Sequence, residues 1–583
     1  MHSIKHIRAL NALIFLLYQK YISITDESSK GMISSLFVLL LLIGFSGMLL
    51  SREYYARFVS LLVMLTGLAM LMNMGYHMQI GTTQQVVWNL LNYDHLRVDL
   101  DLSTTANHYA LIMPFFLMMF FSLLHTYYTP LEERRGRLSS LMLVVMAFLM
   151  LLICADNFLI LIVSASLCGI GGIYIVNDFA GKKTYVFYTL VADMSLFAAM
   201  SIIYSATSNV DLSAIISFSE YHKYRDLAAL LMLLGISIKS GLFLFHKQIF
   251  SYAALSFNRL IFLSYCASPA CGLILFYKMS SLFYASDMCQ TILLTLSILS
   301  VAYGLGGALI YDSLKEKALS INMLLWGSLF IQALVYHNNI FPFSGLLIVL
   351  FYLLNFLLAE IYISGSEEVY ISRLGGTWKK LPMLLLAFFA LSLAILHVLI
   401  TNAYAGFSIW WIEIAIVMIL CSYLIHQIFF GANACDEKVW AFMKHPPFLL
   451  QIPVFVGVAY AFYYNTEYSW LLLCGFGLLI LLVIIHPLRK LAYWYERDEL
   501  QLSEFFERFY EVVLLAPLSI MGRVLWLTVD FLLIERTILS SLAHTRNALI
   551  NLSSHMHSCR LVGYILTTLL GIILMFILGN VLL

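Results

Sequence analysis

Charged residues are scarce in this sequence. Asp, Glu, Lys and Arg make up only 11% of the 583 residues, the formal net charge is +1, and no long basic block is present. A nucleic-acid partner is therefore not expected, because phosphate binding depends on clustered Lys and Arg. Long polar stretches are lacking too, so no part of the chain is expected to form a soluble domain with its own core.

Cysteines at metal-binding spacing are also missing. The nine cysteines include no CxxC pair, and most lie inside apolar runs. This pattern argues against a disulfide framework, a zinc site or an iron–sulfur cluster in this chain. No flavin site or quinone pocket can be named from the sequence either. We therefore expect no catalytic residue, metal or redox cofactor in this chain.

Apolar residues dominate what is present. Hydrophobic residues make up 62% of the chain, and its mean hydropathy is +0.90. This is more apolar surface than one soluble core can bury, which indicates a polytopic membrane protein. Alternating ten-residue barrel strands are not evident, so helices are the expected spanning elements. The fold class predicted is an all-α membrane bundle of about 15 to 16 transmembrane helices, at about 20 residues per crossing.

The apolar runs place these helices along the chain. The N-terminal stretch MHSIKHIRALNALIFLLYQKY is expected to be a retained short helix, since it lacks a small-residue cleavage signature. The polar segment 78–108 is expected to be an external loop. The predicted spans lie near 31–50, 55–75, 108–128, 137–154, 156–176, 185–206, 227–246, 258–277, 290–310, 320–336, 340–362, 381–403, 408–430, 447–463 and 468–487.

The C-terminal region has a different character. Residues 510–559 combine apolar residues with charges at helical spacing, which favours an amphipathic helix lying laterally along the membrane or other helices. Two ordinary loops and a poor transmembrane helix remain an equal alternative. The predicted divisions are N-terminal helices and loop (1–107), a first half with a broken helix at Lys239 (108–283), a second half (284–430), peripheral helices and a surface elbow (431–509), the lateral helix (510–559) and an anchor helix (560–583).

Two glycine-rich stretches are similar in composition to nucleotide-binding loops. GIGG at 169–172 and GLGG at 304–307 both lie within apolar helical runs and lack a strand–turn–helix context. Close packing between helices is therefore the expected role of these glycines.

Two ionisable residues lie in the middle of predicted spans. Lys239 is about midway along 227–246, and Asp193 is in the middle of 185–206. A cation in such a place costs from roughly 3 to over 10 kcal/mol. The structural interpretation is that Lys239 extends its amine to an interface or becomes neutral, or that it forms a static ion pair. The functional interpretation is a proton relay, in which lysine and carboxylate exchange protons as they pair and separate.

Three stretches, in order, resemble a known family. They are NYDHLRVDLDLSTTANHYALIMPFF with ADNFLILIV, then IKSGLFLFHKQI, and then YDSLKEKALSINMLLWGSL. They are similar to the proton-translocating core of NADH–ubiquinone oxidoreductase chain 5, the distal antiporter-like subunit of respiratory complex I. The tail EFFERFYEVVLLAPLSIMGRVLWLTVDFLLIE is similar to that family's segment leading into a long lateral helix, which other antiporter-like chains of the complex lack. The resemblance covers the chain from about Asn92 onward and implies an antiporter-like fold with broken helices.

The resemblance implies roles for three residues. Lys239 falls on the lysine of the family's broken helix, Asp193 on the acidic residue of the preceding helix, and His246 on the histidine of its PLH motif. These three are the candidate proton path. Other positions depart from the family pattern: Ser166 replaces a glutamate, Ser264 a histidine and Phe351 the bridging lysine, and Ile409 lies near the position of a terminal lysine.

Four other ionisable residues are weaker candidates for the proton path. His397 and His426 are in the middle of predicted spans, and Glu360 and Glu413 lie closer to span ends. A single histidine in a helix is more often a hydrogen-bonded core residue than a relay.

Three functions remain open at this point. The first is a membrane-arm subunit of NADH:ubiquinone oxidoreductase that contributes to proton translocation, with NADH, FMN, iron–sulfur clusters and ubiquinone bound elsewhere in the complex. The second is a structural subunit that keeps the fold and the lateral helix but has lost its proton path. The third is a cation/proton antiporter subunit. The resemblance implies neighbouring membrane-arm subunits and lipids as partners, including bound phospholipids. It also implies the mitochondrial inner membrane, with a bacterial plasma membrane as the alternative; the orientation stays open.

Overall fold

The chain divides into two compact units, residues 1–496 and 497–583. The computed structural model describes residues 32–49, 53–79, 84–93, 96–104, 106–128, 135–176, 179–212, 223–336, 341–364, 377–404 and 409–430, with isolated positions between 215 and 458. All of these belong to the first unit. The predicted N-terminal helix, the span 468–487, the surface elbow, the lateral helix and the anchor helix lie outside the described residues, as does most of the span 447–463.

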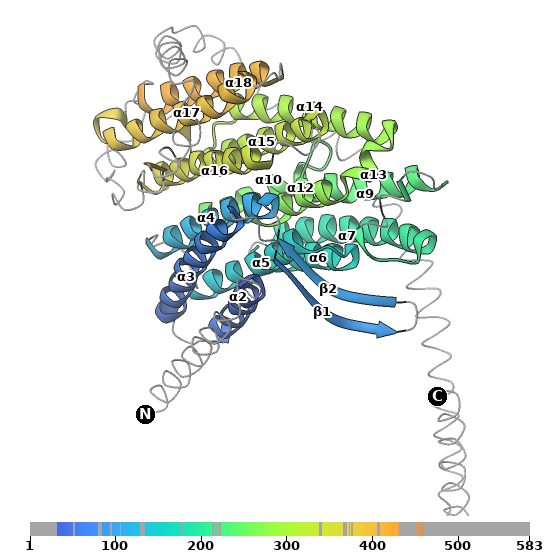
Figure 1. The fold of residues 1–583 in the computed structure, drawn as a ribbon. Helices are drawn as coiled ribbons and strands as arrows, with labels where there is room; N and C mark the ends of the chain where they lie inside the picture. Colours follow the sequence, from blue (N-terminus) through green and yellow to red (C-terminus); the bar gives the residue numbers. More distant parts are fainter. Residues whose placement is uncertain are drawn as a thin grey trace, which may run out of the picture. The chain divides into compact units, whose positions relative to one another are not determined.

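The first part of the bundle consists of helices and one hairpin (Figure 1). Its elements are α2 (Met32–Leu49), α3 (Glu53–Gln79), β1 (Gln84–Tyr93), β2 (Leu96–Thr104), α4 (Ala106–Tyr128), α5 (Arg135–Cys154), α6 (Phe158–Ile175) and α7 (Phe179–Thr207). Helix α6 begins at a capped turn, because the Asn157 side chain accepts a hydrogen bond from the Leu159 amide at 2.9 Å. This cap explains the DNFL joint that separates α5 from α6.

The second part continues with broken and continuous helices. Its elements are α9 (Arg225–Ser240), α10 (Lys247–Phe250), η2 (Ser251–Ala254), α11 (Phe257–Cys266), α12 (Ser268–Lys278), α13 (Ser280–Tyr284), α14 (Asp287–Ile310), α15 (Leu314–Tyr336), α16 (Phe341–Ser364), η4 (Thr377–Lys379), α17 (Pro382–Tyr404), α18 (Ile409–Ile425) and the π-helical segment η5 (His426–Phe430). Every span predicted between residues 31 and 430 coincides with described helix. Two of these spans are interrupted, one after Ser240 and one at Ala267.

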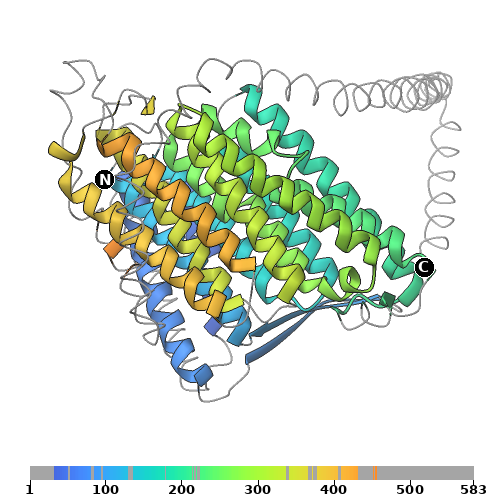
Figure 2. The same cartoon turned by 90° about the horizontal axis from the view of Figure 1, so that it is seen from above.

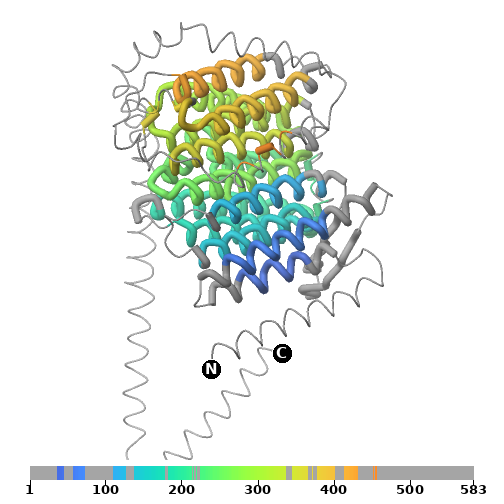
Figure 3. Tube along the Cα trace, turned by 90° about the vertical axis from the view of Figure 1, so that its left-hand side faces the viewer, coloured from blue at the N-terminus to red at the C-terminus, as the bar shows by residue number. Residues whose placement is uncertain are grey.

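The helices run side by side in one general direction (Figures 2 and 3). Helix α9 packs on α7 and on α12, α14 packs on α15, and α4 packs on α16. In the part of the chain that is described, nine helices are long and apolar enough to cross a membrane. The prediction of a helical membrane bundle is thus confirmed. The division at residue 283 and the full number of spans stay predictions.

The polar segment between α3 and α4 differs from its prediction as a loop. It contains β1 and β2, which pair antiparallel from Gln84 opposite Thr104 to Tyr93 opposite Leu96. Apolar and polar residues alternate along LRVDLDLS in β2, the period-two pattern of a strand. In the hairpin, the backbone N–H and C=O groups of the two strands form hydrogen bonds with each other. This satisfies the polar backbone of the segment.

The glycine-rich stretch in α14 serves helix packing, as predicted. A Cβ built on Gly304 would lie 2.6 Å from the Leu324 amide nitrogen and 2.8 Å from the Ser320 carbonyl oxygen, both in the backbone of α15. At Gly306, two residues later and therefore on a different face of α14, the nearest heavy atom would be 4.0 Å away. Gly304 therefore allows α14 and α15 to approach closely, whereas Gly306 does not limit their distance.

We expect Gly304→Ala to destabilise the protein by about 1–3 kcal/mol, because the two backbones would have to separate. Gly306→Ala is the matched control in the same helix. It is expected to be neutral or slightly stabilising, since alanine favours helix over glycine by roughly 0.5–1 kcal/mol. Thermal unfolding of the two purified variants in detergent measures the difference. Equal melting temperatures would show that the α14–α15 contact does not need glycine.

Candidate functional site

The site is built around the interruption of α9. The helix ends at Ser240, and Gly241 follows in the left-handed region with φ of 63°. Leu244 also has a positive φ, 77°, a conformation that is rare for a bulky residue and costs on the order of 1–3 kcal/mol. The chain then re-enters helix at α10. The broken helix implied by the resemblance is therefore present, and its break comes directly after Lys239.

Neighbouring helices satisfy the backbone groups that the break exposes. The Ser268 hydroxyl of α12 donates to the Lys239 carbonyl at 2.9 Å, and the Phe243 amide donates to the Ser300 hydroxyl of α14 at 2.7 Å. The Gly241 amide closes the end of α9 by donating to Ile238 at 3.0 Å. Irregular backbone at membrane depth is tolerated only when its polar groups find such partners. The break is thus a formed part of the fold.

We expect Ser300→Ala to destabilise the protein by about 1–3 kcal/mol, because the half-buried Phe243 amide would lose its acceptor. Ser297 lies one turn earlier in α14, is equally buried, and donates only to Leu293 of its own helix. Ser297→Ala is therefore the matched control, with an expected loss below 1 kcal/mol. Amide hydrogen exchange at residues 241–245, measured by mass spectrometry, should rise in the first variant alone. Unchanged protection would contradict the role of Ser300.

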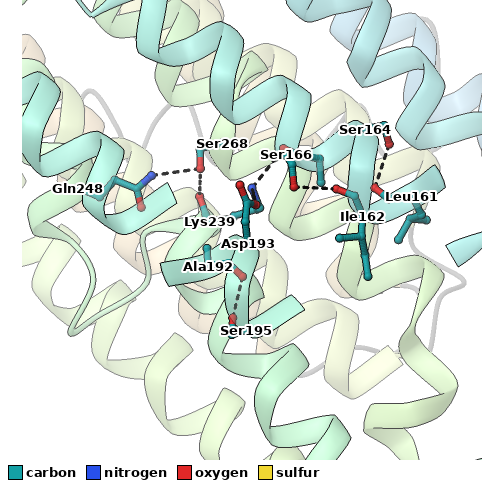
Figure 4. A network of polar contacts seen from close by, with 11 residues as sticks. Leu161, Ile162, Ser164, Ser166, Ala192, Asp193, Ser195, Lys239, Gln248 and Ser268 are labelled. Carbon is teal, nitrogen blue, oxygen red and sulfur yellow. Dashed lines mark hydrogen bonds and ion pairs between the residues drawn. The ribbon is translucent and has the colours of Figure 1, made fainter. Parts of the chain in front are cut away.

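Lys239 and Asp193 form a buried ion pair. Lys239 Nζ lies 2.7 Å from Asp193 Oδ1 and donates to the Ala165 carbonyl oxygen at 3.2 Å. The side chains are 1% and 15% exposed. Asp193 of α7 and Lys239 of α9 face each other (Figure 4), and Ala165 belongs to α6, so three helices converge here. The arrangement supplies the ammonium group with a carboxylate and a carbonyl, which is how a membrane protein keeps such a charge inside.

Glycine creates the space for this pair. A Cβ on Gly169 would lie 2.6 Å from Thr189 Cγ2 and 3.7 Å from Lys239 Nζ. On Gly171 and Gly172 it would meet Val145 and Tyr185 at under 3 Å. The GIGG stretch therefore packs α6 against α5 and α7, as predicted, and one of its glycines borders the ammonium group.

A chain of small polar groups extends from the break toward α12. Gln248 Nε2 donates to the Ser268 hydroxyl at 3.2 Å, and that hydroxyl donates to the Lys239 carbonyl (Figure 4). These contacts join the end of α9, the start of α10 and the start of α12. They hold the Lys239 backbone at the break but bring no titratable side chain to the ammonium group.

His246 lies in different surroundings from the ion pair. Its ring is stacked on Phe243 with centroids 5.9 Å apart, and it also contacts Tyr303 at 4.6 Å and Phe250 at 6.0 Å. The imidazole thus packs among three aromatic rings. Its role in a proton path stays a prediction.

The four departures from the family pattern occupy distinct places. Ser166 is half-buried on α6, beside the carbonyl that binds Lys239, and donates to Ile162 of its own helix. Ser264 is buried and its carbonyl accepts from Trp326 Nε1 at 3.0 Å. Phe351 is part of the apolar core, and Ile409 begins α18. Serine and phenylalanine at these positions cannot carry the charges that the resemblance implies there.

Both glutamates predicted as weaker candidates are buried with specific partners. Glu413 Oε2 of α18 accepts from Gln332 Nε2 of α15 at 2.7 Å. Glu360 Oε1 of α16 lies 3.4 Å from His125 Nε2 of α4. His397 is buried in α17, and His426 begins η5 and is half-buried.

Several buried polar residues outside the Lys239 site were not identified from the sequence. They include His125, Gln332, and a buried cluster in which Asn355 Nδ2 donates to Tyr265 Oη at 2.7 Å and to Asn322 Oδ1 at 2.6 Å. The available signal was the occurrence of amides and a histidine inside runs otherwise made of Leu, Phe and Ile. Such residues need partners at membrane depth, but the sequence does not show which helices supply them.

Comparisons with known proteins agree with this architecture. A chain of the Mrp complex from Dietzia sp. DQ12-45-1b matches 94% of this chain with a TM-score of 0.61 and 15% identity. This chain spans 63% of the length of that relative. A chain of respiratory complex I from Thermus thermophilus with bound aureothin matches 77% of this chain and 97% of its own length, with a TM-score of 0.54 and 17% identity. No curated protein is matched by the sequence. At these identities the structures establish a shared fold.

The family assignment comes from the sequence itself. Residues 140–432, half of the chain, match the family described as NADH:quinone oxidoreductase/Mrp antiporter, transmembrane. The matched residues run from α5 to η5 and include Asp193, Lys239 and the broken helix. The chain belongs to the NADH:quinone oxidoreductase/Mrp antiporter transmembrane family.

Proposed function

We propose that this chain is a membrane-arm subunit of NADH:quinone oxidoreductase that contributes to proton translocation. The observation that carries the proposal is the buried pair of Lys239 and Asp193 directly at the break of α9. An amine and a carboxylate that meet at an interruption in a membrane helix can change partners when the short segment after the break moves. A continuous helix would hold the amine in one place.

The pair suggests how the chain would handle a proton. With Asp193 Oδ1 at 2.7 Å from its Nζ, Lys239 has an acid–base partner in direct contact. If the carboxylate moves away and another acceptor takes its place, Lys239 can pass its proton to that acceptor. Return of the carboxylate restores the pair. A pair that never separates would be a structural element only, and this defines the alternative of a structural subunit without its own proton path.

The resemblance of the sequence to chain 5 of the complex favours the respiratory role. It rests on ADNFLILIV, IKSGLFLFHKQI and YDSLKEKALS in order, and on the tail that begins near residue 504. On this proposal, NADH, FMN, iron–sulfur clusters and ubiquinone are bound by other subunits, and this chain contacts the neighbouring antiporter-like subunit and phospholipids. The mitochondrial inner membrane is the proposed location, with a bacterial plasma membrane as the alternative.

A second candidate, a cation/proton antiporter subunit, is favoured by the shared fold with the Mrp chain. Purification of the tagged chain from native membranes in mild detergent separates the two functions. We expect it to copurify with NADH:quinone reductase activity and with subunits that carry flavin and iron–sulfur spectra. Recovery without that activity, together with sodium- or potassium-dependent proton exchange after reconstitution in vesicles, would overturn the proposal in favour of the antiporter.

A further inference from the structure

A second buried acid–base pair lies away from the Lys239 site. His125 is in the last turn of α4, Glu360 is near the end of α16, and their Nε2 and Oε1 atoms are 3.4 Å apart. The two side chains are 2% and 1% exposed. Helices α4 and α16 pack on each other, so this pair connects the region before the family match with its second half.

The surroundings of the pair are mostly apolar on the side of α16. The Phe356 ring meets the imidazole edge-on, with centroids 5.0 Å apart. Within the part of the chain that is described, Glu360 Oε2 accepts no hydrogen bond. A lone carboxylate is costly in such a place. A carboxyl group beside an imidazole can share one proton with it, either as a neutral acid with a neutral base or as a carboxylate with an imidazolium. Both forms have a net charge of zero. The geometry therefore places two groups that can each hold a proton 3.4 Å apart in a buried position.

Two groups of contacts adjoin this pair, one of hydrogen bonds and one of aromatic rings. On α4, Ser122 and Thr126 bond to Asn258 of α11, with Ser122 Oγ to Asn258 Oδ1 at 3.1 Å and Asn258 Nδ2 to Thr126 Oγ1 at 2.8 Å. Along α16, the Phe356 ring contacts Tyr352, with centroids 6.4 Å apart. Tyr352 in turn meets Tyr265 of the buried amide cluster at 5.5 Å. His125 precedes Thr126 in α4 and its ring contacts Phe356 of α16, so the pair adjoins both groups of contacts.

We propose that His125 and Glu360 form a second proton-exchange site, which supplies a protonatable group to α16 where Phe351 replaces the basic residue implied by the family pattern. The step is a transfer of the proton from the Glu360 carboxyl group to His125 Nε2, giving a carboxylate and an imidazolium; the reverse transfer restores the neutral pair. A direct transfer needs roughly 2.6–3.2 Å, so the side chains must approach by a few tenths of an ångström. This inference rests on the proposed function.

Infrared difference spectroscopy of the whole complex tests the step directly. Spectra recorded with and without NADH and a soluble quinone should contain a carboxyl C=O band that changes during turnover. The band is expected to be lost in Glu360→Gln, shifted in Glu360→Asp and retained in Glu316→Gln, which removes a half-buried carboxylate from the first turn of α15. A C=O band unchanged by turnover, or one that persists in Glu360→Gln, would overturn the proposal.

Proton translocation per electron, measured in vesicles, separates this inference from the proposed function. Glu360→Gln and His125→Gln should each lower the ratio, and Glu360→Asp should recover part of it. Assembly of each variant is checked by native gel. If Lys239→Met lowers the ratio and Glu360→Gln does not, the second site is overturned and the proposed function stands. If neither variant lowers it, both are overturned. If the double variant His125→Gln with Glu360→Gln translocates normally, the pair is structural and the inference fails.

Discussion

With Lys239 replaced by methionine, the assembled complex is expected to oxidise NADH while translocating fewer protons per electron. Methionine keeps an unbranched side chain of similar length in the buried space beside Gly169, but it has no proton to exchange. Removal of a group that transfers a proton typically costs a factor of about 100 to 10,000 in rate, so this chain's contribution should vanish on the time scale of turnover. Proton uptake and NADH oxidation, recorded together in vesicles, give the ratio.

The arginine variant distinguishes a relay from a static pair. Lys239→Arg can keep a cation beside Asp193, yet arginine does not lose its proton in proteins. A relay therefore predicts that Lys239→Arg translocates as poorly as Lys239→Met, whereas a structural pair predicts recovery. Lys223→Met is the matched control, because Lys223 is exposed just before α9. Its Nζ lies over the Tyr224 ring, 5.9 Å from the ring centroid. A normal ratio in both Lys239 variants would remove this residue from the mechanism.

Asp193→Asn is expected to cost about 3–5 kcal/mol of stability, because it leaves the buried ammonium group of Lys239 without its carboxylate. The double variant Asp193→Asn with Lys239→Met removes both charges and should recover most of this loss, since a neutral pair of similar volume no longer carries an uncompensated charge. Melting temperatures of the purified complex in detergent measure the effect. The coupling between the two substitutions is the quantity of interest.

The control for this cycle is Asp211→Asn, in an exposed position after α7. It should change the melting temperature little, because exposed charges contribute about 0–1 kcal/mol. Strict additivity of Asp193→Asn and Lys239→Met would show that the two side chains do not stabilise each other in the membrane, despite the 2.7 Å contact.

The course of the helices followed from the sequence because lipid imposes a length on apolar runs. Runs of about 20 residues predicted the long helices between residues 31 and 430, and glycines in 169–172 and 304–307 indicated close packing. The β1–β2 hairpin was missed because the polarity of the segment suggested a loop, although the alternation in LRVDLDLS contained the signal. The break after Ser240 followed from the resemblance, since the composition around Gly241 alone does not distinguish it from a continuous helix.

The sequence predicted which residues belong to the candidate site, but it did not predict which of them contact each other. Lys239 and Asp193 were evident because a charge in the middle of an apolar run is costly and therefore informative. Glu360 was a weaker candidate, because it lies closer to the end of its span, and its partner His125 is in a different helix far away in the chain. The amides at Asn322 and Asn355 carry no charge and gave no comparable signal, although they bond to each other at 2.6 Å.

The sequence by itself determined that this protein is a helical membrane bundle, where its helices run, and which side chains are too polar to face lipid. The tertiary structure decided which of these side chains meet. The reason is that a helix with apolar residues on nearly all faces has no amphipathic pattern to show which face turns inward. Only the packing of α7 on α9 brings Asp193 to Lys239, and only the packing of α4 on α16 brings His125 to Glu360.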